Sequence, residues 1–112
     1  MTYNYFTPNF EEGTVMEAPI KITDVINKSS AVLHSDGLML YDVIVQEYNA
    51  HHHVIISFDD LNYCTTAFIN ASIGKFLENV DNPQQVFKHL DFIVNDELIN
   101  SKIKRVTDKF IN

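Results

Sequence analysis

A chain of 112 residues, of which 46% are apolar and 21% charged, is long enough to bury one hydrophobic core and too apolar to be a disordered acidic tail. Its formal net charge of -7 argues against nucleic acid as a partner, because phosphate binding depends on lysine and arginine. No apolar run reaches the roughly 20 residues of a membrane span and the N-terminus lacks the pattern of a signal peptide, so we expect a cytoplasmic protein that binds no membrane.

Residues 1–18 are predicted to form an irregular arm. They contain the aromatic residues Tyr3, Tyr5 and Phe6, and no apolar period continues through them. We therefore expect any docking of this arm to use its aromatic side chains. Residues 19–112 are predicted to form one domain, since no linker, repeat or low-complexity stretch divides them.

Two short strands are predicted at the start of the domain. The segment Pro19–Thr23 alternates apolar and polar residues, as a half-buried strand does, and Ala31–Leu33 is a second apolar run. The polar residues 27–30 between them are typical of a turn. We therefore expect the two strands to pair as a hairpin.

A first amphipathic helix is predicted to begin at Ser35–Gly37, where a side-chain oxygen can cap the free backbone N–H groups. The helix ends at Asn49–Ala50 and the three histidines that follow. Its apolar stripe consists of Leu38, Tyr41, Ile44, Val45 and Tyr48.

The run Val54–Phe58 is predicted to be the central strand, because its successive apolar residues are typical of a strand buried on both faces. Thr65 and Thr66 lie between this strand and a second amphipathic helix. A threonine there can cap the helix or accept a phosphate next to the positive end of the helix dipole, and the residues leave both roles open. The apolar face of the helix consists of Phe68, Ile69, Ser72, Ile73, Phe76, Leu77 and Val80.

The remaining chain predicts one more strand and one more helix. Asp81–Pro83 ends the second helix, because proline has no N–H to continue it. Leu90–Val94 is predicted as a buried strand, and Asn95–Asp96 as the cap of a final helix. The order of elements predicts an α/β fold in which about four strands form a sheet and three helices pack against it. The apolar face of the final helix holds Ile99, Ile103, Val106 and Phe110.

The histidines do not predict a metal centre. If His51–His53 enter a strand, successive side chains face opposite ways and at most two of them can share a metal. The other potential ligands, His34, His89 and Cys64, follow no recognised ligand spacing. We therefore expect no metal and no cofactor, and we expect Cys64, which has no second cysteine to pair with, to be a packed thiol.

An enzymatic alternative rests on Asp59 and Asp60, two carboxylates at the end of the central strand where α/β proteins tend to bind ligands. With His53 or His89 in the same pocket, they could provide the general base of a small hydrolase or transferase. The competing interpretation is that the two aspartates form a turn. The sequence contains neither a nucleophile elbow nor a glycine-rich phosphate loop.

Three segments of the chain resemble a bacterial STAS-like family known as DUF4325: Asp36–Ile44, Val54–Leu61 and Thr65–Leu77. The resemblance extends over residues 20–111, and Thr66–Lys75 is its most specific part. It implies a small STAS-like fold with a mixed sheet. It also implies a distant similarity to anti-sigma-factor antagonists, which are cytosolic modules that bind a kinase-like ATPase regulator.

The same resemblance implies a site. In anti-sigma-factor antagonists, a serine at the start of the helix after the central strand accepts phosphate within an Asp-Ser-Ser-Gly-Leu motif. By position, Thr65 stands where the aspartate lies, Thr66 where the phosphorylated serine lies, and Ala67–Ile69 replace Ser-Gly-Leu. The residues expected at the partner-facing edge are Phe68, Asn70, Ser72 and Lys75, of which Phe68 fits the core equally well.

The leading hypothesis is therefore a non-enzymatic regulatory module. It would exchange protein partners, among them a histidine-kinase-like ATPase, through the loop and helix Thr65–Lys75. The alternatives are the small hydrolase or transferase that uses Asp59 and Asp60, and a structural subunit of a larger complex.

Overall fold

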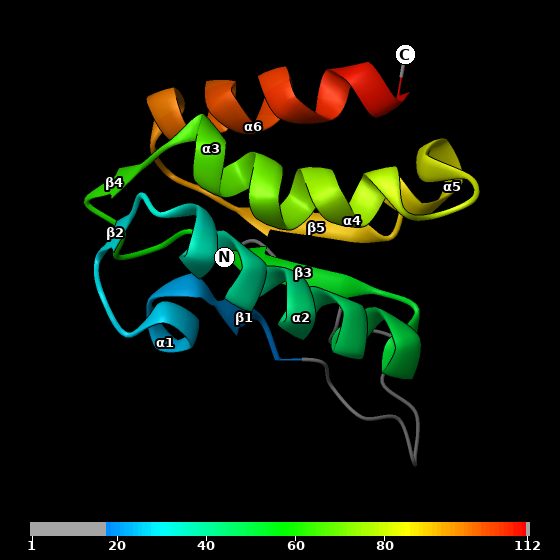
Figure 1. Cartoon of the computed structure of the whole chain (residues 1–112), viewed down its shortest axis with the longest axis horizontal. Coiled ribbons are helices and arrows are strands. Elements are labelled where there is room, and N and C mark those ends of the chain that lie inside the picture. The colour runs from blue at the N-terminus through cyan, green and yellow to red at the C-terminus, as the bar shows by residue number, and fades with distance from the viewer. Residues whose placement is uncertain (1–17, 112) are drawn as a thin grey trace.

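The computed structural model of the chain describes residues 18–111, so the predicted arm lies outside the described residues except for Ala18 (Figure 1). Three of the helical segments, α3 (Thr66–Ile69), η2 (Asn70–Gly74) and α4 (Lys75–Glu78), follow one another without a break and form one continuous helix. The elements in chain order are β1 (Ile20–Lys21), α1 (Ile22–Ile26), β2 (Ser30–Ala31), α2 (His34–His51), β3 (Val54–Ser57), β4 (Tyr63–Cys64), α3 (Thr66–Ile69), η2 (Asn70–Gly74), α4 (Lys75–Glu78), α5 (Pro83–Phe87), β5 (Leu90–Ile93) and α6 (Glu97–Ile111).

The described residues form two small parallel sheets. The larger sheet has the strand order β1-β3-β5, with Ile20 beside Ile56 and Val54 beside Leu90. The prediction that Val54–Phe58 supplies the central strand is confirmed, because β3 pairs with a strand on each side. The smaller sheet pairs β2 with β4, also in parallel.

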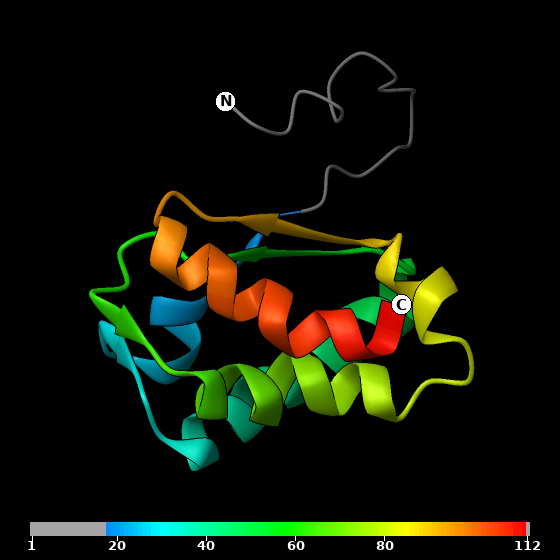
Figure 2. The same ribbon diagram turned by 90° about the horizontal axis from the view of Figure 1, so that it is seen from above.

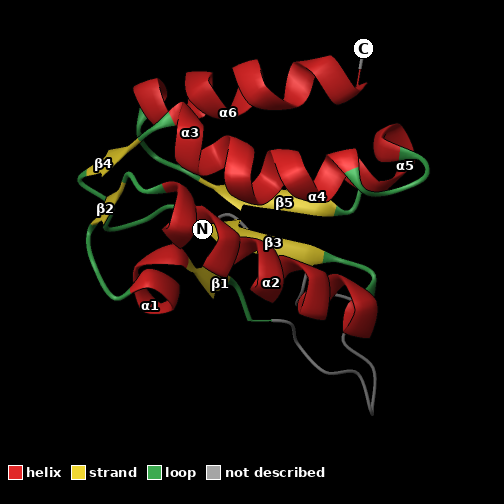
Figure 3. Cartoon of the chain, viewed as in Figure 1, coloured by secondary structure: helices red, strands yellow, loops and turns green. Residues whose placement is uncertain are grey.

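The α/β fold class is confirmed, but the expected numbers of strands and helices are wrong. Residues 18–111 contain five strands in two parallel sheets, where about four strands in one mixed sheet were expected. They contain five helices rather than three when the continuous α3-η2-α4 helix is counted once (Figure 3). The short helices α1 and α5 were not predicted. No helix in the described part of the chain is both long and apolar enough to cross a bilayer.

The helices pack on one face of the larger sheet. Seen from above, α2, the α3-η2-α4 helix and α6 all lie on the same side of β1, β3 and β5 (Figure 2). The core between these layers is closely packed, and its fully buried apolar side chains include Ile22, Leu40, Ile44, Ile56, Phe68, Ile69, Ile73 and Leu77.

The predicted N-terminal hairpin is wrong. Only Ile20–Lys21 is extended, and the chain turns into α1 at Ile22. Because Ile22 and Ile26 are four residues apart, a helix directs both into the core, where they expose 0% and 4% of their surface. The second strand then pairs with β4 instead of β1, which places the loop that precedes α2 next to the loop that precedes α3.

The predicted ends of the helices agree with the structure only in part. Asp96 accepts a hydrogen bond from the backbone N–H of Ile99 at 3.0 Å and caps α6, as predicted. The second helix ends at Glu78, before the predicted stop at Asp81–Pro83, and Pro83 instead begins α5. The predicted side-chain cap of α2 is wrong, because no side chain caps that helix. Asp36 in its first turn instead lies 2.7 Å from the Lys28 ammonium group as an ion pair.

Candidate functional site

Thr65 is the N-cap of the continuous helix. Its hydroxyl oxygen accepts a hydrogen bond from the backbone N–H of Phe68 at 3.1 Å, and its hydroxyl proton is donated to the carbonyl of Val32 at 3.1 Å. Its backbone N–H also donates to the carbonyl of Ala31 at 3.0 Å. The capping role that the sequence left open is thus filled by Thr65, whose hydroxyl joins the starts of the two long helices.

Thr66 differs from its neighbour. It is the first residue of α3, its side chain is half-buried, and its hydroxyl makes no hydrogen bond to any of residues 18–111. Of the two threonines, only Thr66 therefore has a hydroxyl that is not already used in holding the fold. The free backbone N–H groups of the first helical turn lie beside it and favour negative charge at this position.

Three exposed apolar residues lie on the segments that surround these threonines. Val32 and Leu33 precede α2, Tyr63 lies in β4, and they expose 39%, 50% and 50% of their surface. The ammonium group of Lys102 lies 4.9 Å from the centre of the Tyr63 ring and donates to the carbonyl of Cys64 at 2.9 Å. We call Val32, Leu33, Tyr63, Thr65 and Thr66 the hydroxyl corner. Exposed apolar side chains that gather in one place are typical of an interaction surface.

The sequence did not predict the apolar part of this corner. Val32 and Leu33 were assigned to a hairpin strand, and Tyr63 belongs to no apolar period. Their exposure follows from the pairing of β2 with β4, which joins residues more than thirty positions apart in register Ala31 to Cys64. No local pattern in the sequence indicates that pairing.

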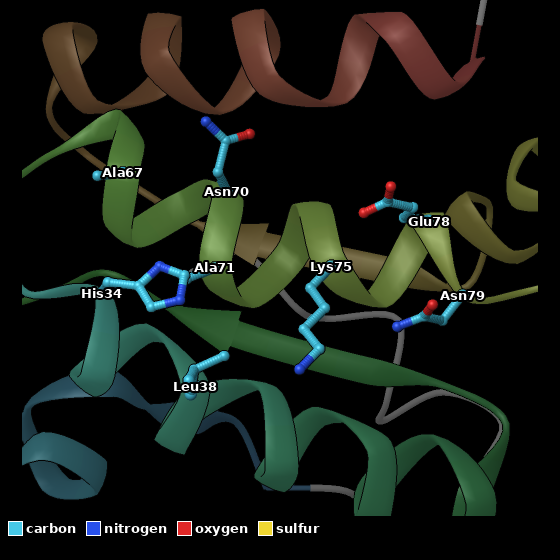
Figure 4. Close-up of a pocket in the computed structure, with 8 residues that line it drawn as sticks. All are labelled: His34, Leu38, Ala67, Asn70, Ala71, Lys75, Glu78 and Asn79. Atoms are coloured by element: carbon cyan, nitrogen blue, oxygen red, sulfur yellow. The ribbon is translucent and has the colours of Figure 1, made fainter.

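A groove begins where the corner ends. It runs between α2 and the α3-η2-α4 helix, and its volume is about 610 Å³ (Figure 4). His34 and Ala67, which directly follow Leu33 and Thr66, stand at one end of it, so the corner and the groove form a continuous surface. The residues that line the groove are His34, Leu38, Ala67, Asn70, Ala71, Lys75, Glu78 and Asn79.

Lys75 and Tyr41 connect the two walls of the groove. The Lys75 side chain extends from α4 toward α2, and its ammonium group lies 4.5 Å from the centre of the Tyr41 ring (Figure 4). The Asn79 side-chain amide donates a hydrogen bond to the Tyr41 hydroxyl at 3.3 Å. These contacts place a cation and an amide within the groove, where polar groups of a bound chain could meet them.

Two of the four expected partner-binding residues lie on this surface and two do not. Asn70 and Lys75 line the groove. The expectation for Phe68 and Ser72 is wrong, because both side chains are fully buried. Residues four apart on a helix share a face, and the face of Phe68 and Ser72 is the one turned to the core. Ala67 and Ala71 take the groove side, which the sequence did not single out.

The middle of this helix is widened. Asn70–Gly74 forms a π-helical turn, and the Ser72 hydroxyl donates to the carbonyls of Phe68 and Ile69 at 2.8 Å and 3.3 Å. Single π-helical turns inside α-helices occur frequently at functional sites. Here the turn lies in the wall of the groove, since Asn70 and Ala71 belong to both.

The carboxylates of the enzymatic alternative have structural partners. The Asn95 amide donates to a carboxylate oxygen of Asp59 at 3.0 Å. Asp60 has a left-handed backbone, with φ of 70°, and its carboxylate lies 2.8 Å from the Lys21 ammonium group. The hydrogen bond and the charge of Asp60 raise the pKa of Lys21. These contacts agree with the interpretation of the two aspartates as turn residues.

The histidines of the same alternative lie at the opposite end of the sheet. His53 directly precedes β3 and His89 directly precedes β5, whereas Asp59 follows the carboxyl end of β3. Because β3 and β5 are parallel, their N-terminal ends lie together, about 13 Å of strand away from the aspartates. The structure therefore does not bring Asp59 or Asp60 together with either histidine in one catalytic pocket.

The histidine run does not converge on one point. His51 ends α2 with a ring nitrogen 3.8 Å from the Glu47 carboxylate, and His52 is the left-handed residue that follows, with φ of 58°. A ring nitrogen of His53 lies 2.7 Å from the Asp91 carboxylate. Within residues 18–111, no group of three or more histidine, cysteine, aspartate or glutamate side chains is arranged to hold a metal ion.

Cys64 is buried beneath the hydroxyl corner, as expected of a packed thiol. Burial raises the pKa of its thiol to about 12, and the nearby charge of Lys102 offsets only part of this effect. The thiol therefore stays protonated at neutral pH.

Alkylation of Cys64 by iodoacetamide at pH 8 is expected to be about a thousandfold slower in the folded protein than in urea, since each unit by which the pKa is raised lowers the thiolate fraction tenfold. Mass spectrometry of the alkylated protein over time measures both rates. The urea-unfolded chain is the control for the intrinsic reactivity of the thiol. Native and unfolded rates within tenfold of each other would contradict the buried placement.

Comparison with known proteins gives one match. A family model described as a STAS-like domain of unknown function (DUF4325) matches residues 36–100, from the first turn of α2 into α6. The matched region contains both threonines and every groove residue except His34. No curated protein and no solved structure matches the chain.

Proposed function

The chain belongs to this STAS-like family, DUF4325, and from that membership we propose that it is a regulatory module that acts by binding another protein rather than by catalysis. The binding surface in this proposal is the hydroxyl corner together with the adjoining groove. The observation that carries the proposal is the position of Thr66, a half-buried threonine with an unused hydroxyl, among the exposed apolar residues of the corner.

Phosphorylation of Thr66 would change this surface in a specific way. A phosphate adds about two negative charges at neutral pH. The first turn of the helix would stabilise those charges, because its free N–H groups are the positive end of the dipole. An apolar partner surface that covers Leu33 and Tyr63 would then have to remove water from a charged group, which weakens the complex. Thr66 would thus act as a switch between a bound and a released state.

The partner that we propose is a histidine-kinase-like ATPase regulator, the class implied by the similarity to anti-sigma-factor antagonists. Such a partner would both bind the corner and transfer phosphate to Thr66, in the bacterial cytoplasm. Lys75 and Asn79 would contact polar groups of the partner along the groove, because they supply a cation and an amide there. The Asn70 side chain points toward α6, where its oxygen lies 3.5 Å from the Lys109 ammonium group (Figure 4).

The test begins with a search of the reading frames beside the gene of this chain for one that encodes a histidine-kinase-like ATPase, which is then purified as the partner. Binding of the wild-type protein is compared with binding of Thr66→Ala and Thr66→Glu by titration calorimetry. We expect Thr66→Ala to bind within about threefold of wild type, and Thr66→Glu to bind at least tenfold more weakly, equivalent to about 1.4 kcal/mol. Transfer of labelled phosphate from ATP is expected for wild type and absent for Thr66→Ala.

Thr23 provides the matched control. It lies in the first turn of α1, away from the groove, so Thr23→Ala and Thr23→Glu should leave affinity and phosphate transfer unchanged. Equal affinity for wild type, Thr66→Ala and Thr66→Glu would remove any switching role for the Thr66 hydroxyl. Absence of any complex with the ATPase would instead favour a structural subunit over a regulatory module.

The roles of the two threonines also differ in their effect on stability. Thr65→Ala is expected to lower the free energy of unfolding by about 1 kcal/mol, because it removes the cap of the continuous helix and the bond to the Val32 carbonyl. Thr66→Ala removes no such contact and should change stability by less than about 0.5 kcal/mol. Urea unfolding monitored by circular dichroism measures both values, and a larger loss from Thr66→Ala would reverse the assignment.

A further inference from the structure

The side of the continuous helix that carries Thr66 is turned to α6. Asn70 lies four residues after Thr66, so the two side chains share one side of the helix. The Asn70 side-chain oxygen lies 3.5 Å from the Lys109 ammonium group of α6 (Figure 4). A β-carbon on Gly74, a further four residues along, would lie 3.2 Å from a Val106 methyl group of α6. Thr66 is therefore the first residue of a row that faces α6.

Lys102 of α6 lies next to the start of this row. Its ammonium group donates to the Cys64 carbonyl at 2.9 Å, and Cys64 is only two residues before Thr66. Neighbouring Cα atoms are 3.8 Å apart, so the Cα atoms of Cys64 and Thr66 are at most about 7.6 Å apart. The helix α3 packs against α6, which runs alongside it in both views (Figures 1 and 2). A group attached to the Thr66 hydroxyl is thus within reach of the Lys102 ammonium group.

The Lys102 ammonium group retains donors for a further acceptor. An ammonium group has three N–H donors, and Lys102 uses one of them for the Cys64 carbonyl. Lys109, seven residues farther along α6, lies on the same face of that helix. Neither lysine forms an ion pair with a carboxylate of residues 18–111. The two lysines are therefore a local excess of positive charge in a chain whose net charge is -7.

We propose that Lys102 holds the phosphate of phosphorylated Thr66 and draws it toward α6. This inference rests on the proposed phosphorylation of Thr66. That step joins the terminal phosphoryl group of ATP to the Thr66 hydroxyl oxygen, with ADP as the leaving group and the hydroxyl proton released to water. Lys102 takes no part in the transfer. It binds the doubly charged product by charge-assisted hydrogen bonds, which are stronger than bonds between neutral groups.

A purely structural role for Lys102 is the competing interpretation. The bond to the Cys64 carbonyl and the contact with the Tyr63 ring, whose centre lies 4.9 Å away, hold β4 beside α6. If Lys102 did nothing more, it would contribute the same stability whether or not Thr66 is phosphorylated. The energetic coupling between the phosphate and Lys102 therefore separates the two interpretations.

The test places phosphothreonine at position 66 of the full chain by chemical synthesis. Cys64 is the single cysteine, so a fragment of residues 1–63 can be ligated there to a synthetic peptide of residues 64–112 that carries the phosphate. Urea unfolding at pH 8 gives the folding equilibrium constant with and without phosphate, for the wild-type sequence and for Lys102→Gln. We expect the phosphate to raise this constant at least about threefold more in the wild-type sequence than in Lys102→Gln.

Lys104→Gln is the matched control, because it removes the same charge from the same helix. Lys104 is exposed and lies two residues from Lys102, so it points to a different side of α6. This substitution should leave the effect of the phosphate unchanged. An equal effect of the phosphate in the wild-type sequence and in Lys102→Gln would overturn the proposal. Equal changes from Lys102→Gln and Lys104→Gln would overturn it too, because only the general charge of α6 would then act.

A second measurement uses the unaltered sequence, in case Lys102→Gln does not fold. The synthetic peptide carries isotope-labelled side-chain nitrogen atoms in Lys102 and Lys104, and NMR spectra of their ammonium groups are compared with and without the phosphate. We expect the Lys102 signal to shift on phosphorylation and the Lys104 signal to stay in place. An unmoved Lys102 signal would overturn the proposal.

Both measurements use this chain alone, so their results do not depend on whether the ATPase binds the hydroxyl corner. If the ATPase released phosphorylated protein while Lys102 and the phosphate showed no coupling, the proposed function would stand and only this inference would fail. If the coupling were found but the ATPase neither bound nor phosphorylated the chain, the proposed function would fail and the role of Lys102 toward the phosphate would stand.

Discussion

Replacing Phe68 with alanine is expected to lower the free energy of unfolding by about 4 kcal/mol, the largest loss that we expect from a single substitution in this protein. Phe68 is fully buried and is the largest of the side chains with no exposed surface. The helix α3 that carries it packs against both α2 and α6, so its removal would leave a cavity where three helices meet. Urea unfolding followed by circular dichroism measures the change.

Leu98→Ala is the control for this experiment. Leu98 is also apolar and helical, but it exposes 61% of its surface, so its loss should cost less than about 0.5 kcal/mol. A similar small loss from Phe68→Ala would mean that the ring does not lie in the core, and Phe68 would again become a candidate for partner contact. Substitutions that test the groove should use Asn70 or Lys75, which do not support the core in this way.

Replacing Gly37 with alanine is expected to lower the free energy of unfolding by about 2 kcal/mol, although alanine is the better helix former. A β-carbon on Gly37 would lie 2.6 Å from the Ala71 β-carbon and 2.8 Å from the Phe68 carbonyl oxygen. The carbonyl belongs to the backbone of the neighbouring helix, so relief of the clash requires α2 and the continuous helix to move apart. That movement would also widen the groove between them.

Gly74→Ala provides the matched comparison. A β-carbon there would lie 3.2 Å from a Val106 methyl group and 3.3 Å from the Asn70 side-chain oxygen, which are both side-chain atoms. Small rotations can accommodate it, and the gain in helix propensity offsets the crowding, so stability should stay within about 1 kcal/mol of wild type. If Gly37→Ala and Gly74→Ala lowered the free energy of unfolding equally, separation of the two helices at Gly37 would not be the cause of the lower stability.

Much of the fold follows from local patterns in the sequence. The continuous apolar run Val54–Ile56 identifies a strand buried on both faces, and the helical spacing of Ile99, Ile103 and Val106 identifies one face of α6. The caps at Thr65 and Asp96 are also local, because each side chain bonds a backbone N–H three residues ahead. Such features depend on neighbours within one or two turns, so the sequence alone is sufficient to predict them.

The wrong predictions concern segments whose local sequence pattern fits two different structures. Pro19–Thr23 alternates as a strand, but Ile22 and Ile26 are also spaced for a helix, and contact with the core selected the helix α1. The helical stripe of the second helix does not show by itself whether Phe68 and Ser72 are turned to the core or to a partner. Packing against α2 and α6 turned both residues to the core.

The sequence by itself therefore determined the α/β class, the central strand, the long helices and the presence of a threonine pair at a helix start. Only the tertiary structure decided which of the two hydroxyls is free, because the Thr65 hydroxyl donates a hydrogen bond to the carbonyl of Val32, a residue of another loop. The tertiary structure also places a groove next to the two threonines, and it places His53 and Asp59 at opposite ends of β3. These features depend on contacts between segments far apart in the chain, and no short-range spacing of residues encodes such contacts.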